Sequence, residues 1–203
     1  MKWILPVLIA ISTMAPPLAQ AQETYTHATN HSPFDGQYVS IYNGYGTNNT
    51  FSEALTFDDV TYNDAYFLGF GYGRPLFWLR PGWQIDGELI GVVHEQNDDI
   101  FYEGDIGFLL RWTTPPWHNW VKSSIAGGVG LSYASKVPPL ERELHPNDES
   151  ARFLSALFVE AEAEVTRNWF GVLRLHHRSG AFGLFSDVDA GSNHVTVGIR
   201  RRF

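Results

Sequence analysis

Long segments of this chain alternate apolar and charged residues with a period of two, and this alternation limits the fold more than any other feature. In residues 82–95, Trp83 and Leu89 occupy one set of positions, whereas Asp86 and Glu88 occupy the other. Successive side chains of a β-strand point to opposite faces. Each such segment therefore predicts a strand with one apolar face and one charged face.

The alternating runs are separated by turn-forming residues. We expect strands at residues 37–45, 65–74, 82–95, 100–113, 121–134, 151–165, 168–179 and 193–203. After residue 21 no window holds the roughly 20 apolar residues that a membrane-spanning helix needs, but a closed β-barrel also satisfies its backbone groups in lipid. We therefore predict an all-β protein, a transmembrane antiparallel β-barrel of about eight strands with a charged, side-chain-filled lumen.

A soluble barrel with an apolar interior is the alternative, because alternation alone does not say which face points inward. The expected strand 121–134 argues against it. The side chains on its polar face are small: Ser124, Ala126, Gly128, Gly130 and Ser132. Across a narrow lumen, acidic side chains from some strands can meet arginines from others. This favours a charged lumen and an apolar surface in contact with lipid.

The connections between the expected strands are of two lengths. Shorter turns are expected at 75–81, 114–120 and 166–167, the first two rich in proline and tryptophan, and longer polar loops at 46–64, 135–150 and 180–192. Short periplasmic turns and longer outer loops are typical of outer-membrane barrels. The loop charges Lys136, Glu141, Arg142 and Glu143 are interpreted as solvated.

The first 21 residues have the form of a secretory signal peptide. Lys2 precedes a short apolar run at residues 3–12, and Ala19-Gln20-Ala21 is a small-x-small cleavage pattern. Cleavage after Ala21 leaves one barrel domain over residues 22–203, located in the outer membrane. The alternative is an uncleaved signal anchor.

Composition excludes several classes of function. The net charge is −8, and it becomes −9 once Lys2 is removed, which argues against a nucleic-acid partner. The chain has no cysteine for disulfide or thiol chemistry. Four histidines, His94, His118, His145 and His194, show no metal-ligand spacing with one another. We expect no cofactor and no metal site. The sequence does not decide between a monomer and a homodimer.

Three polar residues are expected to converge on the outward face near the end of two strands. His177 and Ser179 follow Leu173 and Leu175 on that face, and strand pairing should bring Asn193 beside them. Polar groups facing hydrocarbon are costly, so their convergence indicates a functional site. The alternative is a polar cluster at the level of the lipid headgroups.

The residue types suit acyl transfer. Ser179 would be the nucleophile, His177 its general base, and Asn193 the residue that orients the imidazole. An oxyanion hole is expected from backbone N–H groups after the serine, with turn freedom from a nearby glycine: Gly180, Ala181 and Gly183.

The C-terminal segment carries a resemblance to a known family. LHHRSGAFGLF, then GSN, then a strand ending in Phe203 resembles the lipid A 3-O-deacylase family and the broader group of related acyloxyacyl hydrolases. The resemblance is strong over residues 174–203, with weaker echoes in GVGLSYAS. It implies an eight-stranded barrel whose Ser–His–acid triad hydrolyses an ester-linked acyl chain of lipid A at the outer leaflet. His177 and Ser179 match the family's His-x-Ser pair.

The chain departs from the family pattern at two positions. Asn193 lies where the deacylases carry a Glu, and Gly180 lies where they carry an Asn after the serine. Asn can fix the imidazole tautomer but cannot balance the charge of an imidazolium. A slow hydrolase, rescue by Asp187 or Asp189, and an inactive relative are the alternatives.

The leading hypothesis is an outer-membrane esterase without a cofactor that acts on lipid A of lipopolysaccharide. The competing hypothesis is a non-enzymatic structural or adhesion-type barrel whose loops carry the function. A soluble ligand-binding barrel is the third.

Overall fold

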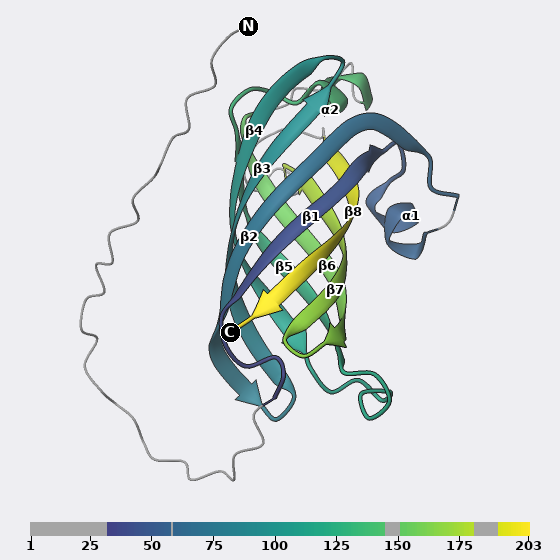
Figure 1. The fold of residues 1–203 in the computed structure, drawn as a ribbon. Coiled ribbons are helices and arrows are strands. Elements are labelled where there is room, and N and C mark those ends of the chain that lie inside the picture. Colours follow the sequence, from purple (N-terminus) through teal and green to yellow (C-terminus); the bar gives the residue numbers. More distant parts are fainter. Residues whose placement is uncertain (1–31, 58, 145–150, 181–190) are drawn as a thin grey trace, which may run out of the picture. The chain divides into compact units, whose positions relative to one another are not determined.

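Eight strands form one closed antiparallel barrel, in which each strand pairs with its neighbours in the chain (Figure 1). The computed structural model describes residues 32–57, 59–144, 151–180 and 191–203. The strands are β1 (Tyr38–Thr47), β2 (Tyr62–Arg80), β3 (Trp83–Gln96), β4 (Asp99–Trp112), β5 (Ser123–Ala134), β6 (Phe153–Thr166), β7 (Trp169–Ser179) and β8 (Gly191–Arg202). Pairing of β1 with β8 closes the barrel. The predicted fold class is confirmed, while the predicted signal peptide lies outside the described residues.

The two faces of the wall divide as the alternation predicts. Asp86 and Glu88 are buried in the lumen, whereas Leu89 is 54% exposed on the outside. Many other large apolar side chains are exposed on the strands, including Ile41, Phe70, Ile106, Phe108, Val129, Val197 and Ile199. Closure leaves no unpaired strand edge, and the exterior is apolar, so the barrel is of the transmembrane type. Among the described residues, no helix is long and apolar enough to cross a membrane.

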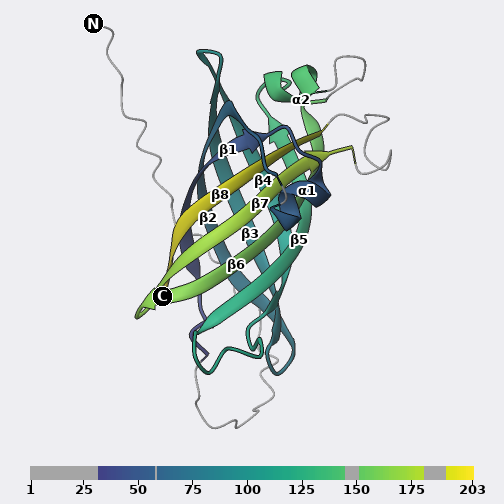
Figure 2. The same cartoon turned by 90° about the vertical axis from the view of Figure 1, so that its right-hand side faces the viewer.

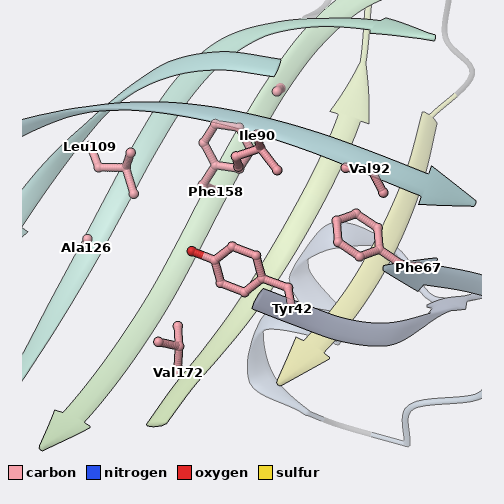
Figure 3. Packing of buried hydrophobic residues seen from close by; sticks show 9 residues of the cluster. Tyr42, Phe67, Ile90, Val92, Leu109, Ala126, Phe158 and Val172 are labelled. Carbon is pink, nitrogen blue, oxygen red and sulfur yellow. The ribbon is translucent and has the colours of Figure 1, made fainter. Parts of the chain in front are cut away.

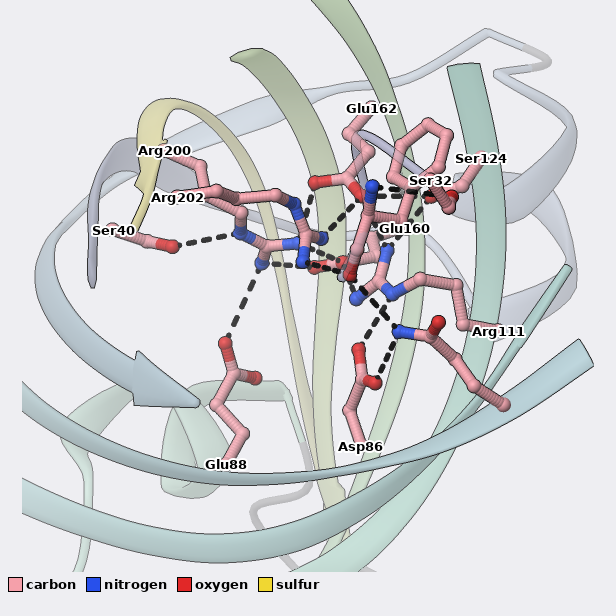
Figure 4. A network of polar contacts seen from close by, with 12 residues as sticks. Ser32, Ser40, Asp86, Glu88, Arg111, Ser124, Glu160, Glu162, Arg200 and Arg202 are labelled. Atoms are coloured by element: carbon pink, nitrogen blue, oxygen red, sulfur yellow. Dashed lines mark hydrogen bonds and ion pairs between the residues drawn. The ribbon is translucent and has the colours of Figure 1, made fainter. Parts of the chain in front are cut away.

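Four arginines and four carboxylates form a buried ion-pair network in the lumen. Figure 4 labels all of its members except Arg174. Arg111 Nε lies 2.6 Å from Asp86 Oδ2, and Arg200 Nη1 lies 2.7 Å from oxygens of both Glu160 and Glu162. The remaining members are Arg174, Arg202 and Glu88. Because the signs balance and the donors are forked guanidinium groups, the network satisfies charges that are costly to bury alone.

An apolar layer also occupies the lumen, which the sequence analysis did not predict. Tyr42, Phe67 and Phe158 pack with smaller aliphatic side chains on the inner face (Figure 3). Tyr42 joins this layer to the ion pairs, because its hydroxyl donates to Glu88 Oε1 at 3.1 Å and accepts from Arg200 Nη2 at 2.7 Å. The lumen is therefore filled partly by charge and partly by aromatic packing.

Segments outside the strands close both ends of the lumen. At one end, which we call the turn end, Phe34 is fully buried and its carbonyl accepts from Arg202 Nη1 at 2.9 Å. At the other, which we call the loop end, helix α2 (Pro139–Leu144) buries Leu140 and Glu141. The interpretation of Glu141 as a solvated loop charge is wrong, because the carboxylate accepts from Arg178 Nη1 at 2.9 Å.

The predicted turn at 75–81 is wrong. β2 continues through Pro75 to Arg80, and only Pro81 and Gly82 separate it from β3. Gly82 has a φ of +79°, which favours glycine. The register shifts between Pro75 and Phe77, and a shift of this kind accommodates a proline that cannot donate to the ladder.

The ion-pair network predicts a large effect of one neutralised carboxylate. Glu160→Gln should cost about 3–5 kcal/mol of unfolding free energy, because it leaves buried arginines without compensation. Glu164→Gln on the same strand is the matched control, because Glu164 faces an exposed Lys122 at 3.7 Å and should cost under about 1 kcal/mol. Urea unfolding of the refolded barrel in lipid measures both, and equal effects would contradict the assigned role of the network.

Candidate active site

The connection between β1 and β2 contains a short helix, α1 (Phe51–Thr56), that the sequence analysis did not predict. Thr50 caps it: its side chain accepts from the Glu53 N–H, and the Glu53 carboxylate accepts from the Thr50 N–H at 2.9 Å. These hydrogen bonds, chiefly the one from the Thr50 backbone, lower the pKa of the exposed Glu53. The Thr-x-x-Glu capping box was the available sequence signal for this helix.

Helix α1 lies outside the barrel, over the wall formed by β7 and β8 (Figure 2). Ala54 packs against Leu175 and Val195, all three are buried, and Phe51 packs beside them. The prediction that this part of the wall faces lipid directly is therefore wrong at the loop end. Farther along the same strands, Val197 and Ile199 are exposed as predicted.

His177 and Asn193 are paired across β7 and β8, as the sequence predicted. His177 Nδ1 lies 2.7 Å from Asn193 Oδ1. The Phe51 ring packs at 5.0 Å from the imidazole, centroid to centroid. The hydrogen bond to Asn193 and the aromatic contact with Phe51 therefore help to hold the imidazole on the outer face of the wall.

A second hydrogen bond fixes how the Asn193 amide is oriented. Asn193 Nδ2 donates to the carbonyl oxygen of Asn49 at 2.9 Å. A carbonyl only accepts, so the amide nitrogen faces Asn49 and the amide oxygen faces His177. Because the amide oxygen only accepts, His177 Nδ1 must carry the ring proton. In the neutral imidazole, Nε2 is then unprotonated and can accept a proton. This is the tautomer that a general base needs.

Ser179 ends β7, two residues beyond His177 on the same outward face. Its carbonyl accepts from Ser155 Oγ at 2.6 Å, which ties the end of β7 to β6. Gly180 follows and is buried. Ala181, Gly183, Asp187 and Asp189 lie outside the described residues. The structure thus brings His177 and Asn193 into contact and places Ser179 on their face of the wall.

The tautomer of His177 can be measured directly. In ¹⁵N NMR of histidine-labelled barrel, we expect the neutral ring of His177 to carry its proton on Nδ1. Asn193→Leu should abolish this preference, whereas Asn63→Leu, which removes an amide of β2 that donates to Asn48 Oδ1, should not. A wild-type proton on Nε2 would contradict the assignment.

Comparisons with known proteins bear on the fold. No family model matches the sequence, and no curated protein gives a significant match. The crystal structure of the outer membrane enzyme PagL is similar, with a TM-score of 0.52 and 12% identity, over 82% of this chain and 99% of that one. Neisserial surface protein A (NspA) gives a TM-score of 0.48 and 15% identity, over 83% of this chain and 98% of that one. The likeness to PagL shows that this chain has the fold of an outer-membrane β-barrel.

Proposed function

We propose that this protein is an outer-membrane esterase that removes an ester-linked acyl chain from lipid A. The observation that carries the proposal is the hydrogen bond between His177 Nδ1 and Asn193 Oδ1 on the outer face of the wall. It orients an imidazole for base catalysis on the outside of the barrel. The resemblance of residues 174–203 to the lipid A deacylases supports the same assignment.

Each residue has a defined role in the proposed reaction. Ser179 Oγ attacks the ester carbonyl, and His177 Nε2 takes the hydroxyl proton. The imidazolium then returns that proton to the leaving sugar oxygen as the acyl-enzyme forms. Water, activated by the same imidazole, releases the fatty acid and restores Ser179. The backbone N–H groups of Gly180 and Ala181, with turn freedom from Gly183, would stabilise the oxyanion.

A lipid substrate fits the location of these residues. They lie on the outside of the barrel near the loop end, so a substrate would arrive laterally from the membrane and not through the lumen. Helix α1 beside them exposes Leu55, and Phe57 follows it, with exposed fractions of 41% and 50%. Such side chains suit contact with acyl chains at the edge of the outer leaflet.

Asn193 in place of a carboxylate limits the expected rate. An amide fixes the tautomer but does not balance the imidazolium charge that develops in the transition state. We therefore expect slow turnover relative to an enzyme with a complete Ser–His–acid triad. The amide has a compensating role here, because a carboxylate could not donate to the Asn49 carbonyl as Asn193 Nδ2 does.

Mass spectrometry of lipid A from cells that express the protein tests the proposal. Wild type should remove one acyl mass, and Ser179→Ala or His177→Ala should reduce deacylation at least about 10³-fold, because nucleophile and base act as a unit. Ser123→Ala is the control, since Ser123 lies near the turn end and its hydroxyl accepts from Trp117 Nε1 at 2.9 Å.

Folding of each variant is checked by its heat-modifiable migration in gels. If lipid A is unchanged by folded wild type, both in cells and with detergent-released protein, the esterase assignment is wrong and a structural or adhesion role takes its place. If Ser179→Ala keeps wild-type activity, the nucleophile is misassigned.

A further inference from the structure

A second cluster of ionisable groups occupies the lumen at the loop end, apart from the arginine-rich network. Glu103, Asp105 and His176 are all buried, and one ligand-type atom of each lies within 4.8 Å of those of the other two. His176 Nε2 lies 2.9 Å from Glu103 Oε1 and 3.8 Å from Asp105 Oδ2. The expectation from sequence spacing that no metal site exists did not consider this cluster, because β4 and β7 bring it together.

The charges in this cluster do not balance. Among the described residues, the buried charged groups of the loop end are three carboxylates and one guanidinium: Glu103, Asp105, Glu141 and Arg178. The arginine-rich ion-pair network, in contrast, pairs four carboxylates with four guanidinium groups. Counted over these described residues, carboxylates outnumber guanidinium groups at the loop end. A divalent cation would remove this imbalance.

Asp105 supplies an independent indication. It is 5% exposed, yet neither carboxylate oxygen accepts a hydrogen bond from the described residues. Its nearest cross-strand partner in β5 is Ser132, whose hydroxyl is also buried and unpaired. Buried carboxylates without donors are costly, and a bound ion is one arrangement that offsets this cost. Of these two oxygens, Oδ2 lies 3.8 Å from His176 Nε2, on the side of the other two side chains of the cluster.

We propose that this cluster binds one divalent transition-metal ion through Glu103, Asp105 and His176. Two ligand atoms at about 2.1 Å from a tetrahedral Zn²⁺ are roughly 3.4 Å apart. The observed separations of 2.9 and 3.8 Å bracket that value. One imidazole and two carboxylates form a donor set that suits Zn²⁺ and its neighbours in the first transition series.

Neighbouring groups hold the proposed ligands in place. His94 Nε2 lies 3.0 Å from Glu103 Oε2, whereas His176 contacts the other oxygen, so the two histidines together fix the orientation of that carboxylate. The Phe67 ring packs against His94 and His176 at 5.3 and 5.1 Å, centroid to centroid. Such supporting contacts orient metal ligands and tune their affinity. Arg178 links Glu103 to Glu141 of α2, so the site lies beneath the loop-end cover.

The test uses untagged full-length barrel refolded in detergent without metal, and Zn²⁺ as the probe. We expect calorimetric titration and elemental analysis to give one tightly bound Zn²⁺ per chain. Asp105→Asn and His176→Gln should each weaken binding at least about 10-fold. His118→Gln is the matched control, because His118 lies in the β4–β5 connection at the turn end and should leave affinity unchanged.

A measurement on wild type alone keeps the test independent of variant folding. X-ray absorption of the Zn²⁺-loaded protein should show a first shell of nitrogen and oxygen with imidazole scattering. Thermal unfolding should shift upward with Zn²⁺ in wild type and in His118→Gln, but not in Asp105→Asn. Absence of stoichiometric Zn²⁺, or equal affinity in Asp105→Asn and wild type, would overturn the proposal. These readouts do not depend on esterase activity.

Discussion

The buried ion pairs between arginines and carboxylates are the interaction on which the barrel depends. Arg200 on β8 bonds to Glu160 and Glu162 on β6, and Arg111 on β4 bonds to both as well. A register slip of one residue would turn these side chains toward lipid. The ion pairs offset the desolvation cost of these buried charges only when every strand is in its native register. The network thus specifies one pairing of the strands as well as filling the lumen.

Much of the fold follows from local information. Alternation in β3 and β4 predicted both faces, and the pairing of His177 with Asn193 followed from joining two consecutive strands. The turn at 75–81 was misplaced because proline signalled a break where β2 absorbs it in an irregular register. The contact of Asn49 with Asn193 spans 144 positions. Nothing in the local sequence of either residue encodes such a contact. The capping box could have indicated the helix α1, but not its position over the wall.

The asparagine at position 193 joins two parts of the molecule. Its oxygen faces His177 on β7, and its nitrogen faces the segment that leads into α1. A carboxylate would serve the imidazole but would repel the Asn49 carbonyl. An amide at position 193 therefore has a structural role in this chain, since it anchors the segment that carries Phe51 against the imidazole.

The barrel wall is a single layer of strands, so inward-facing and outward-facing side chains are attached to the same backbone. His176 and His177 are neighbours on β7, as are His194 and Asn193 on β8, and each pair points one member inward and one outward. A displacement of the β7 or β8 backbone at the inner histidines moves the same peptide units that carry the outer pair. The packing of His176 and His194 in the lumen therefore constrains the backbone positions of His177 and Asn193 on the outer face.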